Sequence, residues 1–219
     1  MGCARRAASV TVLAATVMWP VAGSAQVAWD GPMLMAPGAP AGWGFHLVDP
    51  EGGDGLGGLV SWRGAAAPVG LGFRVGIYEG FRDDLALAGG VDVSGTIHRG
   101  QGEVPLDVIW FAGAGLGIED DLLLSFPAGI ALGWSVGGED VAFRPYVAPR
   151  LVLDAFLDDD DGDGDDRPRR DDDDLDLGAA VELGLDLAFD PDWAIRAAGS
   201  FGDRDAVSIG IVITPNSRR

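Results

Sequence analysis

The stretch Leu175–Phe189, LDLGAAVELGLDLAF, alternates between mostly large apolar residues and small or acidic residues along its whole length. Because side chains in a strand point alternately to the two faces of a sheet, this period of two indicates β-structure. The run is far longer than the roughly 5–6 residues of an average globular strand. One face carries mainly leucines, and the other carries glycine, alanine, Asp176, Glu182 and Asp186. We therefore predict one long strand with a strongly apolar face.

Similar alternating segments recur through most of the chain and are separated by short polar turns. Short turns require neighbouring strands to run antiparallel, since a parallel crossover needs about a dozen residues or more. The sequence thus predicts an all-β, antiparallel up-and-down barrel of ten strands, in which the first two are the weakest and eight is the nearest alternative count. The expected strands are Trp43–Val48, Leu56–Arg63, Val69–Tyr78, Leu85–Ile97, Leu106–Ile118, Leu122–Val136, Val141–Leu153, Leu175–Phe189, Trp193–Phe201 and Val207–Ile213.

The composition of the two faces favours a transmembrane barrel over a water-soluble one. A soluble sheet would expose long polar side chains, whereas the second face here carries glycine, alanine and charges of both signs. Such residues suit the crowded lumen of a narrow barrel, so the apolar face would meet lipid. Five tryptophans on the apolar face, most of them near strand ends, are typical of interfacial girdles. The charges expected to pair across the lumen are Arg74, Asp92, Asp107, Arg144, Arg150, Glu182, Asp186 and Arg196.

The first 25 residues have the pattern of a secretory signal peptide. Arg5 and Arg6 precede the apolar stretch Val10–Val21, and small residues end at Ala25, where cleavage is expected. The apolar stretch is short for a membrane-spanning helix, which needs about 20 residues. Cys3, the single cysteine, would leave with the signal, so no disulfide or thiolate chemistry is expected. The expected organisation is a signal peptide over 1–25, an irregular lead-in over 26–41, a barrel over 42–214 and a tail over 215–219.

The chain is strongly acidic, and its charge limits its partners. It contains 34 acidic and 15 basic residues, a net charge of −19, and every basic residue is an arginine. Such a surface repels nucleic acid and anionic lipid and attracts cations or basic partners. Beyond the signal peptide no segment holds 18 consecutive apolar residues, so membrane insertion would have to use strands.

The segment 158–174, DDDDGDGDDRPRRDDDD, is the most acidic part of the chain. Three aspartates at alternate positions followed by Gly164 match the opening of an EF-hand-type calcium loop. The position of the closing carboxylate, however, holds Arg170, and no helices are expected on either side. A solvated extracellular loop that attracts cations weakly is therefore the alternative, and no other cofactor is expected. The candidate Ca²⁺ ligands are Asp159, Asp161, Asp163 and Asp165.

The chain offers little for catalysis. Its two histidines are His46, in the weak first segment, and His98, at a strand end with Ser94 four residues earlier on the same face. A lone histidine at a strand end is more often a loop residue than a general base. We therefore expect no enzymatic activity.

The alternating pattern resembles the small outer-membrane β-barrel proteins of the OmpA/OmpX type over essentially the whole chain after the signal peptide. The resemblance implies the outer membrane of a Gram-negative-type bacterium, outer-membrane lipid as surroundings and insertion by the barrel-assembly machinery. Such proteins usually finish on a strand with an aromatic last residue, whereas the final strand here ends Ile211-Val212-Ile213 and a short tail follows.

Two functions remain open on these observations. The first is a structural or surface-interaction barrel whose lumen is filled by charge pairs and whose acidic loop meets cations or extracellular partners. The second is a small passive pore in which the same charges line a water-filled path. A soluble periplasmic β-barrel or sandwich that binds a ligand is a more distant alternative.

Overall fold

The computed structural model is built from strands joined by turns and irregular segments. It describes residues 28–50, 55–66, 68–79, 85–100, 105–119, 122–138, 141–157, 175–190 and 192–215. Among the residues described, no helix is long and apolar enough to cross a membrane. The strands are β1 (Gly42–Pro50), β2 (Gly57–Arg63), β3 (Val69–Glu79), β4 (Leu85–His98), β5 (Asp107–Ile118), β6 (Leu122–Gly133), β7 (Val136–Gly137), β8 (Ala142–Leu157), β9 (Leu175–Asp190), β10 (Trp193–Gly202) and β11 (Ala206–Ile213).

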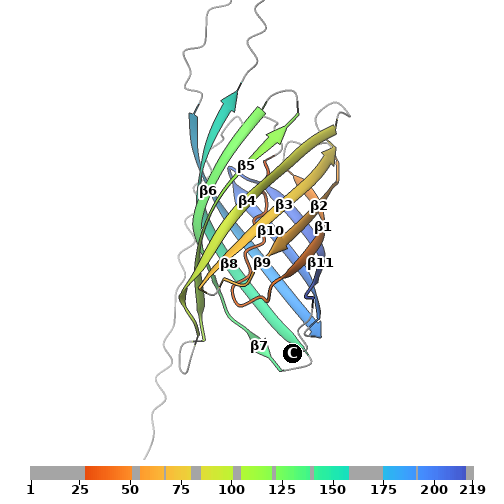
Figure 1. The fold of residues 1–219 in the computed structure, drawn as a ribbon, viewed down its shortest axis with the longest axis vertical. Coiled ribbons are helices and arrows are strands. Elements are labelled where there is room, and N and C mark those ends of the chain that lie inside the picture. Colours follow the sequence, from red (N-terminus) through yellow and green to blue (C-terminus); the bar gives the residue numbers. More distant parts are fainter. Residues whose placement is uncertain are drawn as a thin grey trace, which may run out of the picture.

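The ten long strands form one closed antiparallel ring, which confirms the predicted all-β up-and-down barrel (Figure 1). Each long strand pairs with the next one along the chain, and β6 pairs with β8 because β7 is only a two-residue strand beside β8. Pairing of β1 with β11 closes the ring. The strand count is ten, not eight, and the two weakest predicted segments are β1 and β2 of this ring.

The two ends of the barrel differ in which connections they carry. We call the end at which β11 finishes the base, which lies lower in Figure 1, and the opposite end the mouth. β8 ends and β9 begins at the mouth, so the acidic segment 158–174 connects two strand ends there. The four candidate Ca²⁺ ligands fall in this segment and lie outside the described residues. They are Asp159, Asp161, Asp163 and Asp165.

Most strand ends lie within two residues of the prediction, and two differ by more. The expected strand Leu122–Val136 is divided into β6 and β7, because the β6–β8 ladder reaches Pro145, which has no N–H with which to continue it. The Trp134 N–H still donates to the Pro145 carbonyl at 3.3 Å. β8 continues to Leu157, beyond the predicted end at Leu153, because its backbone stays paired with β6 as far as Leu157 and with β9 as far as Ala155. The carboxylate of Asp154 faces inward there and binds Arg204.

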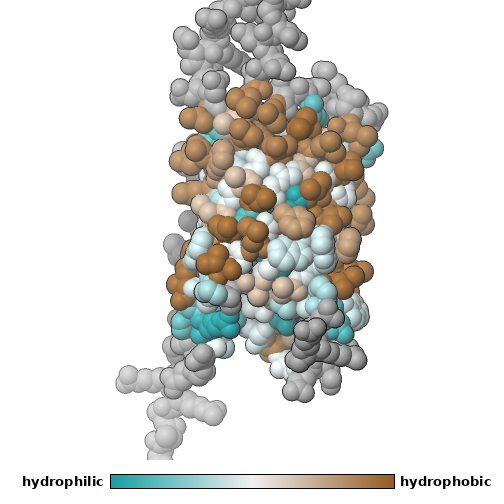
Figure 2. Space-filling model, viewed as in Figure 1, coloured by the Kyte–Doolittle hydropathy of each residue, from teal (hydrophilic) through white to brown (hydrophobic). Residues whose placement is uncertain are grey.

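The outer wall of the barrel is apolar over every long strand. Burial alternates along the strands, and on β9 the side chain of Leu183 is 53% exposed while its neighbour Glu182 is fully buried. Figure 2 shows apolar side chains gathered over the outer face, with more hydrophilic residues toward the base. Outward-facing apolar residues include Phe45, Val60, Leu71, Leu87, Leu116, Phe126, Leu151, Leu183, Phe201 and Ile209, one from each long strand.

A segment that precedes β1 occupies the interior of the barrel. We call residues 28–36 the lumen segment; it is seen in orange-red within the ring in Figure 1. Trp29 lies toward the mouth, where its indole N–H donates to the Ser125 carbonyl near the start of β6, and Pro37 lies beside Gly133 at the base. Trp29, Met33, Leu34 and Met35 are at most 1% exposed and form the centre of the hydrophobic core. The irregular lead-in is therefore the filling of the lumen, a position that the sequence did not predict.

Candidate functional site

The indole ring of Trp29 sits in a socket made by glycines of β4 and β5. A Cβ atom added to Gly90, Gly113 or Gly115 would lie 2.4–2.7 Å from atoms of the Trp29 ring. Such distances are shorter than any van der Waals contact. The indole ring of Trp29 therefore fits only because these three positions carry no side chain. The guanidinium of Arg74 lies 5.7 Å from the ring centroid, within the range of a cation–π contact. The glycines of the inner face thus make room for the lumen segment.

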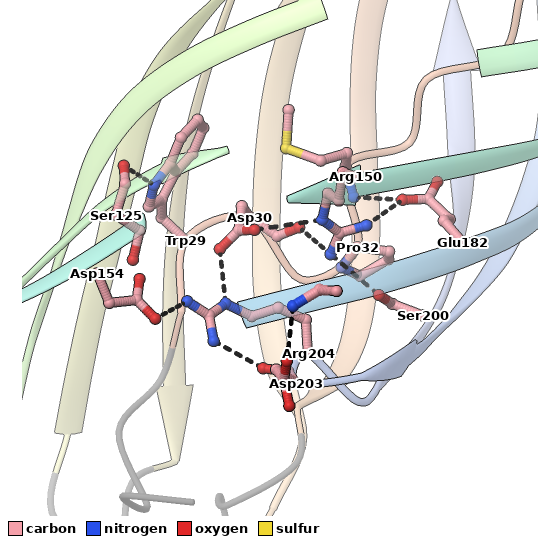
Figure 3. A network of polar contacts seen from close by, with 12 residues as sticks. Trp29, Asp30, Pro32, Ser125, Arg150, Asp154, Glu182, Ser200, Asp203 and Arg204 are labelled. Carbon is pink, nitrogen blue, oxygen red and sulfur yellow. Dashed lines mark hydrogen bonds and ion pairs between the residues drawn. The ribbon is translucent and has the colours of Figure 1, made fainter. Parts of the chain in front are cut away.

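The carboxylate of Asp30 is held by two arginines toward the mouth (Figure 3). Arg150 on β8 donates from Nε to Asp30 at 3.3 Å, and from Nη2 to the Asp30 carbonyl and the Ser200 hydroxyl at 3.0 Å each. Arg204, in the turn between β10 and β11, donates to Asp30 at 3.1 Å and also to Asp154. Burial lowers the pKa of Arg204, but the two carboxylates outweigh it and raise that pKa above its ordinary value. The buried charge of Asp30 is therefore fully paired.

Glu182, in the middle of β9, binds the backbone of the lumen segment. Its two carboxylate oxygens accept the N–H groups of Met33 at 2.6 Å and Leu34 at 2.8 Å. The Tyr146 hydroxyl donates to the same carboxylate at 2.8 Å, and a guanidinium nitrogen of Arg150 lies 3.5 Å away. Glu182 is fully buried, so these contacts replace its hydration. One carboxylate thereby contacts both the lumen segment and two residues of the neighbouring strand β8.

Arginines bind the carbonyl groups of the same segment. Arg74 donates to the carbonyl oxygens of Pro32, at 2.6 Å, and of Met33. Arg63 donates to those of Met33 at 3.2 Å and Leu34 at 2.9 Å, and it forms an ion pair with Asp92 at 2.7 Å. Charge-assisted hydrogen bonds of this kind are roughly twice as strong as neutral ones. The inner wall therefore holds the segment through its main chain.

Toward the base, two arginines share one carboxylate. Arg144 and Arg196 approach the same oxygen of Asp186 at 3.3 and 3.2 Å, and Arg196 also donates to the Leu34 carbonyl at 3.3 Å. Asp107 lies apart from these groups at the start of β5, where it accepts the Gly100 N–H at 2.9 Å.

The eight charges expected in the lumen lie on the inner side of the wall, and the structure brings seven of them into contact with one another or with further lumen groups. Arg144, Arg196 and Asp186 form one group, and Arg150 and Glu182 another. Arg74 and Asp92 bind groups that were not predicted, and Asp107 contacts backbone only. Charged residues of the lumen that the sequence reasoning missed are Asp30, Arg63, Asp154 and Arg204.

A signal for some of the missed residues was present in the sequence. Arg63 has the inward phase of β2, two residues after Ser61, and Asp154 has the inward phase of β8. Arg63 is the last residue of its predicted strand and Asp154 lies one residue beyond the predicted end of another, and alternation is hardest to judge at strand ends. Asp30 and Arg204 lie outside the strands, so periodicity carries no information about them.

The histidines do not form a catalytic arrangement within the described residues. His46 faces the lumen on β1, is 4% exposed, and neither of its ring nitrogens has a described hydrogen-bond partner. His98 is exposed at the base end of β4, and no described hydrogen bond joins it to the buried Ser94. In the part of the chain that the structure covers, no group of three or more histidine, cysteine, aspartate or glutamate residues is placed to hold a metal ion.

The Trp29 socket yields a prediction with a matched control. Substitution Gly90→Ala should destabilise the barrel by about 1–3 kcal/mol, the usual cost of overpacking, because the new methyl group collides with the indole. Gly58→Ala places the same methyl group on the outer face of β2, where no atom lies within 4 Å, so it should be neutral or slightly stabilising. The measurement is urea unfolding of both variants refolded in detergent. Equal effects of the two substitutions would contradict the socket.

No model of a known protein family matches this chain, and a search of curated proteins finds no similar sequence.

Proposed function

We propose that this protein is an outer-membrane β-barrel of a Gram-negative-type bacterium, with a structural or surface-interaction role and a lumen closed by its own N-terminal segment. In this proposal residues 1–25 are a cleaved signal peptide, and the barrel is of the small OmpA/OmpX type. The barrel-assembly machinery inserts it, the acidic segment 158–174 faces the exterior, where it meets cations or extracellular partners, and the protein has no catalytic activity.

The observation that carries the proposal is the outer wall. Soluble monomers rarely expose contiguous apolar patches larger than a few hundred Å². Here apolar side chains face outward from all ten long strands, and many are about half exposed, as with Leu71 at 56% and Ile209 at 56%. A closed ring satisfies the backbone hydrogen bonds of its strands internally, which is what a lipid environment demands. An apolar, edgeless wall of this kind is stable in lipid and would aggregate in water.

Aromatic residues add support at one end of the barrel. They gather around the base, where a membrane interface would lie, as aromatic belts do in membrane barrels. Trp62 stacks on Phe73 with ring centroids 5.7 Å apart, and Phe189 stacks on Trp193 at 5.0 Å. Members of this belt are Trp43, Trp62, Phe73, Trp110, Trp134, Phe143, Phe189 and Trp193.

The lumen contents favour a closed barrel over a passive pore. An interior of about eight strands is already nearly filled by side chains, and here a chain segment with a tryptophan, two methionines and a leucine is added. Glu182 and five arginines hold that segment by hydrogen bonds. A continuous path for ions would require these contacts to break.

A charge placed on the outer wall tests the membrane assignment. In phospholipid vesicles, Leu183→Arg at the middle of β9 should destabilise the barrel by about 2–4 kcal/mol, because a cation at the bilayer midplane loses its hydration. Leu175→Arg, at the mouth end of the same face, should destabilise the barrel by only about 0–1 kcal/mol, because an arginine near the membrane interface stays hydrated. The free energy of unfolding is measured by urea titration in vesicles, with both variants compared with the parent chain.

Cell fractionation provides the independent check. The mature chain should sediment with the outer membrane, begin at Gln26 and resist extraction by urea and carbonate. Recovery in the soluble periplasmic fraction without detergent, or equal and negligible effects of the two arginine substitutions, would instead identify a soluble β-barrel.

A further inference from the structure

A cavity of about 520 Å³ opens at the base of the barrel, between the lumen segment and the inner wall. Its volume falls in the range of small-molecule sites, roughly 300–1,000 Å³. Its walls combine apolar side chains, such as Met35 and Ile109, with a few charged and hydroxyl groups. This combination, an apolar container with a few fixed polar groups, is that of a ligand pocket.

The charges that line the cavity are opposite in sign to those of the chain as a whole. The lining includes four arginines but only one carboxylate, that of Asp107, in a chain whose net charge is −19. One of the arginines, Arg63, is neutralised by Asp92 at 2.7 Å. The base cavity is therefore a local positive site within an acidic protein. The other lining arginines are Arg99, Arg144 and Arg196.

The pairing pattern leaves part of this positive charge without a counterion. Arg144 and Arg196 both point to a single oxygen of Asp186, at 3.3 and 3.2 Å, so two cations share one anion. Arg196 is 7% exposed and Ser94 is 1% exposed, and both line the cavity. The Nε of Arg196 and the hydroxyl of Ser94 have no hydrogen-bond partner among the described residues. Buried donors of this kind are costly unless a partner satisfies them.

We propose that the base cavity binds a small organic anion that carries a phosphate or carboxylate group. The anionic group would lie on the cavity side of Arg144 and Arg196, away from Asp186, where it accepts guanidinium N–H groups that Asp186 does not bind and supplies the second counterion. The rest of the ligand would lie along the apolar lining at Ala36 and Ala66, which are partly exposed. This inference concerns the inner wall alone, so it stands whether or not the outer wall is in a membrane.

Calorimetry with phenyl phosphate tests the proposal on the folded barrel in a non-ionic detergent. Phenyl phosphate should bind, inorganic phosphate should bind more weakly because it lacks the apolar part, and phenol should not bind because it lacks the charge. Benzoate in a parallel titration distinguishes a carboxylate site from a phosphate site. Heats for phenyl phosphate and benzoate that match titration into detergent alone, or binding of phenol as tight as that of phenyl phosphate, would overturn the proposal.

Two variants link the binding to the cavity charges. Arg144→Gln should weaken phenyl phosphate binding by roughly tenfold or more, since a charge-assisted hydrogen bond is lost while Arg196 still neutralises Asp186. Asp107→Asn removes the one lining carboxylate but can still accept the Gly100 N–H, so it should strengthen binding. Circular dichroism confirms that each variant folds. An affinity unchanged in Arg144→Gln, or unchanged or reduced in Asp107→Asn, contradicts an anion site.

Discussion

A chain that lacks residues 28–36 should form ion channels in planar bilayers, whereas the full chain should give no stable conductance steps. Removal of the lumen segment leaves the inner wall with its glycines, among them Gly90, Gly113 and Gly115, which can no longer be covered by Trp29. The arginines that bound carbonyl groups would then face water. After Asp30 leaves with the segment, arginines and carboxylates are present in nearly equal numbers in the remaining lumen, so the channel should show little preference between chloride and potassium.

The control for this experiment is a chain with a deletion in a different part of the barrel. A chain without residues 158–174 keeps the lumen segment and should stay closed like the parent. The measurements are single-channel conductance and the reversal potential in a salt gradient. Stable conductance steps from the full chain would show that the barrel is a pore with the segment in place, and would defeat the closed-barrel proposal.

Glu182→Ala should destabilise the barrel by about 3–5 kcal/mol, the usual result of removing one partner from a buried ion pair. The substitution leaves the N–H groups of Met33 and Leu34 and the Tyr146 hydroxyl without their acceptor, and it removes a carboxylate next to Arg150. Glu182→Gln should lower the free energy of unfolding by less, about 1–3 kcal/mol, since the amide oxygen still accepts one of these hydrogen bonds. The measurement is the free energy of unfolding in urea.

Asp176 on the same strand provides the control for Glu182. It lies on the same face of β9 but is exposed near the mouth, so Asp176→Ala should change stability by no more than about 0.5 kcal/mol. If Glu182→Ala cost as little as Asp176→Ala, the carboxylate would not anchor the lumen segment, and the segment would be held by apolar packing alone.

Most of the fold could be predicted because the alternation of apolar and polar residues along a barrel strand shows which side chains face outward and which face the lumen. Leu183 and Glu182 could be assigned to opposite faces from their phase alone, and the structure places them so. Even the weak first segment obeys this rule, since His46 and Val48 point inward and Phe45 and Leu47 outward. Periodicity fails where the chain is not a strand, so the same reasoning could not place Trp29 or Asp30.

The contacts of the candidate site were harder to predict than its residues. Phase predicts that Arg74 faces the lumen, but its hydrogen bonds go to the carbonyl oxygens of Pro32 and Met33, and a sequence does not show which backbone groups will need a partner. From the sequence alone, the glycine-rich inner face is explained by the crowding of a narrow lumen. The structure gives a more specific reason, since glycines such as Gly115 are the complement of one particular side chain, Trp29.

The way the wall holds the lumen segment also bears on how such a protein can diverge over generations. Glu182, Arg63 and Arg74 contact amide and carbonyl groups, which every amino acid other than proline supplies in full. Substitutions between apolar residues of similar volume at Met33 or Met35 would leave those contacts intact. We therefore expect descendants of this chain to keep the arginines, Glu182 and the socket glycines, while the segment that they enclose drifts in sequence around Trp29 and Asp30.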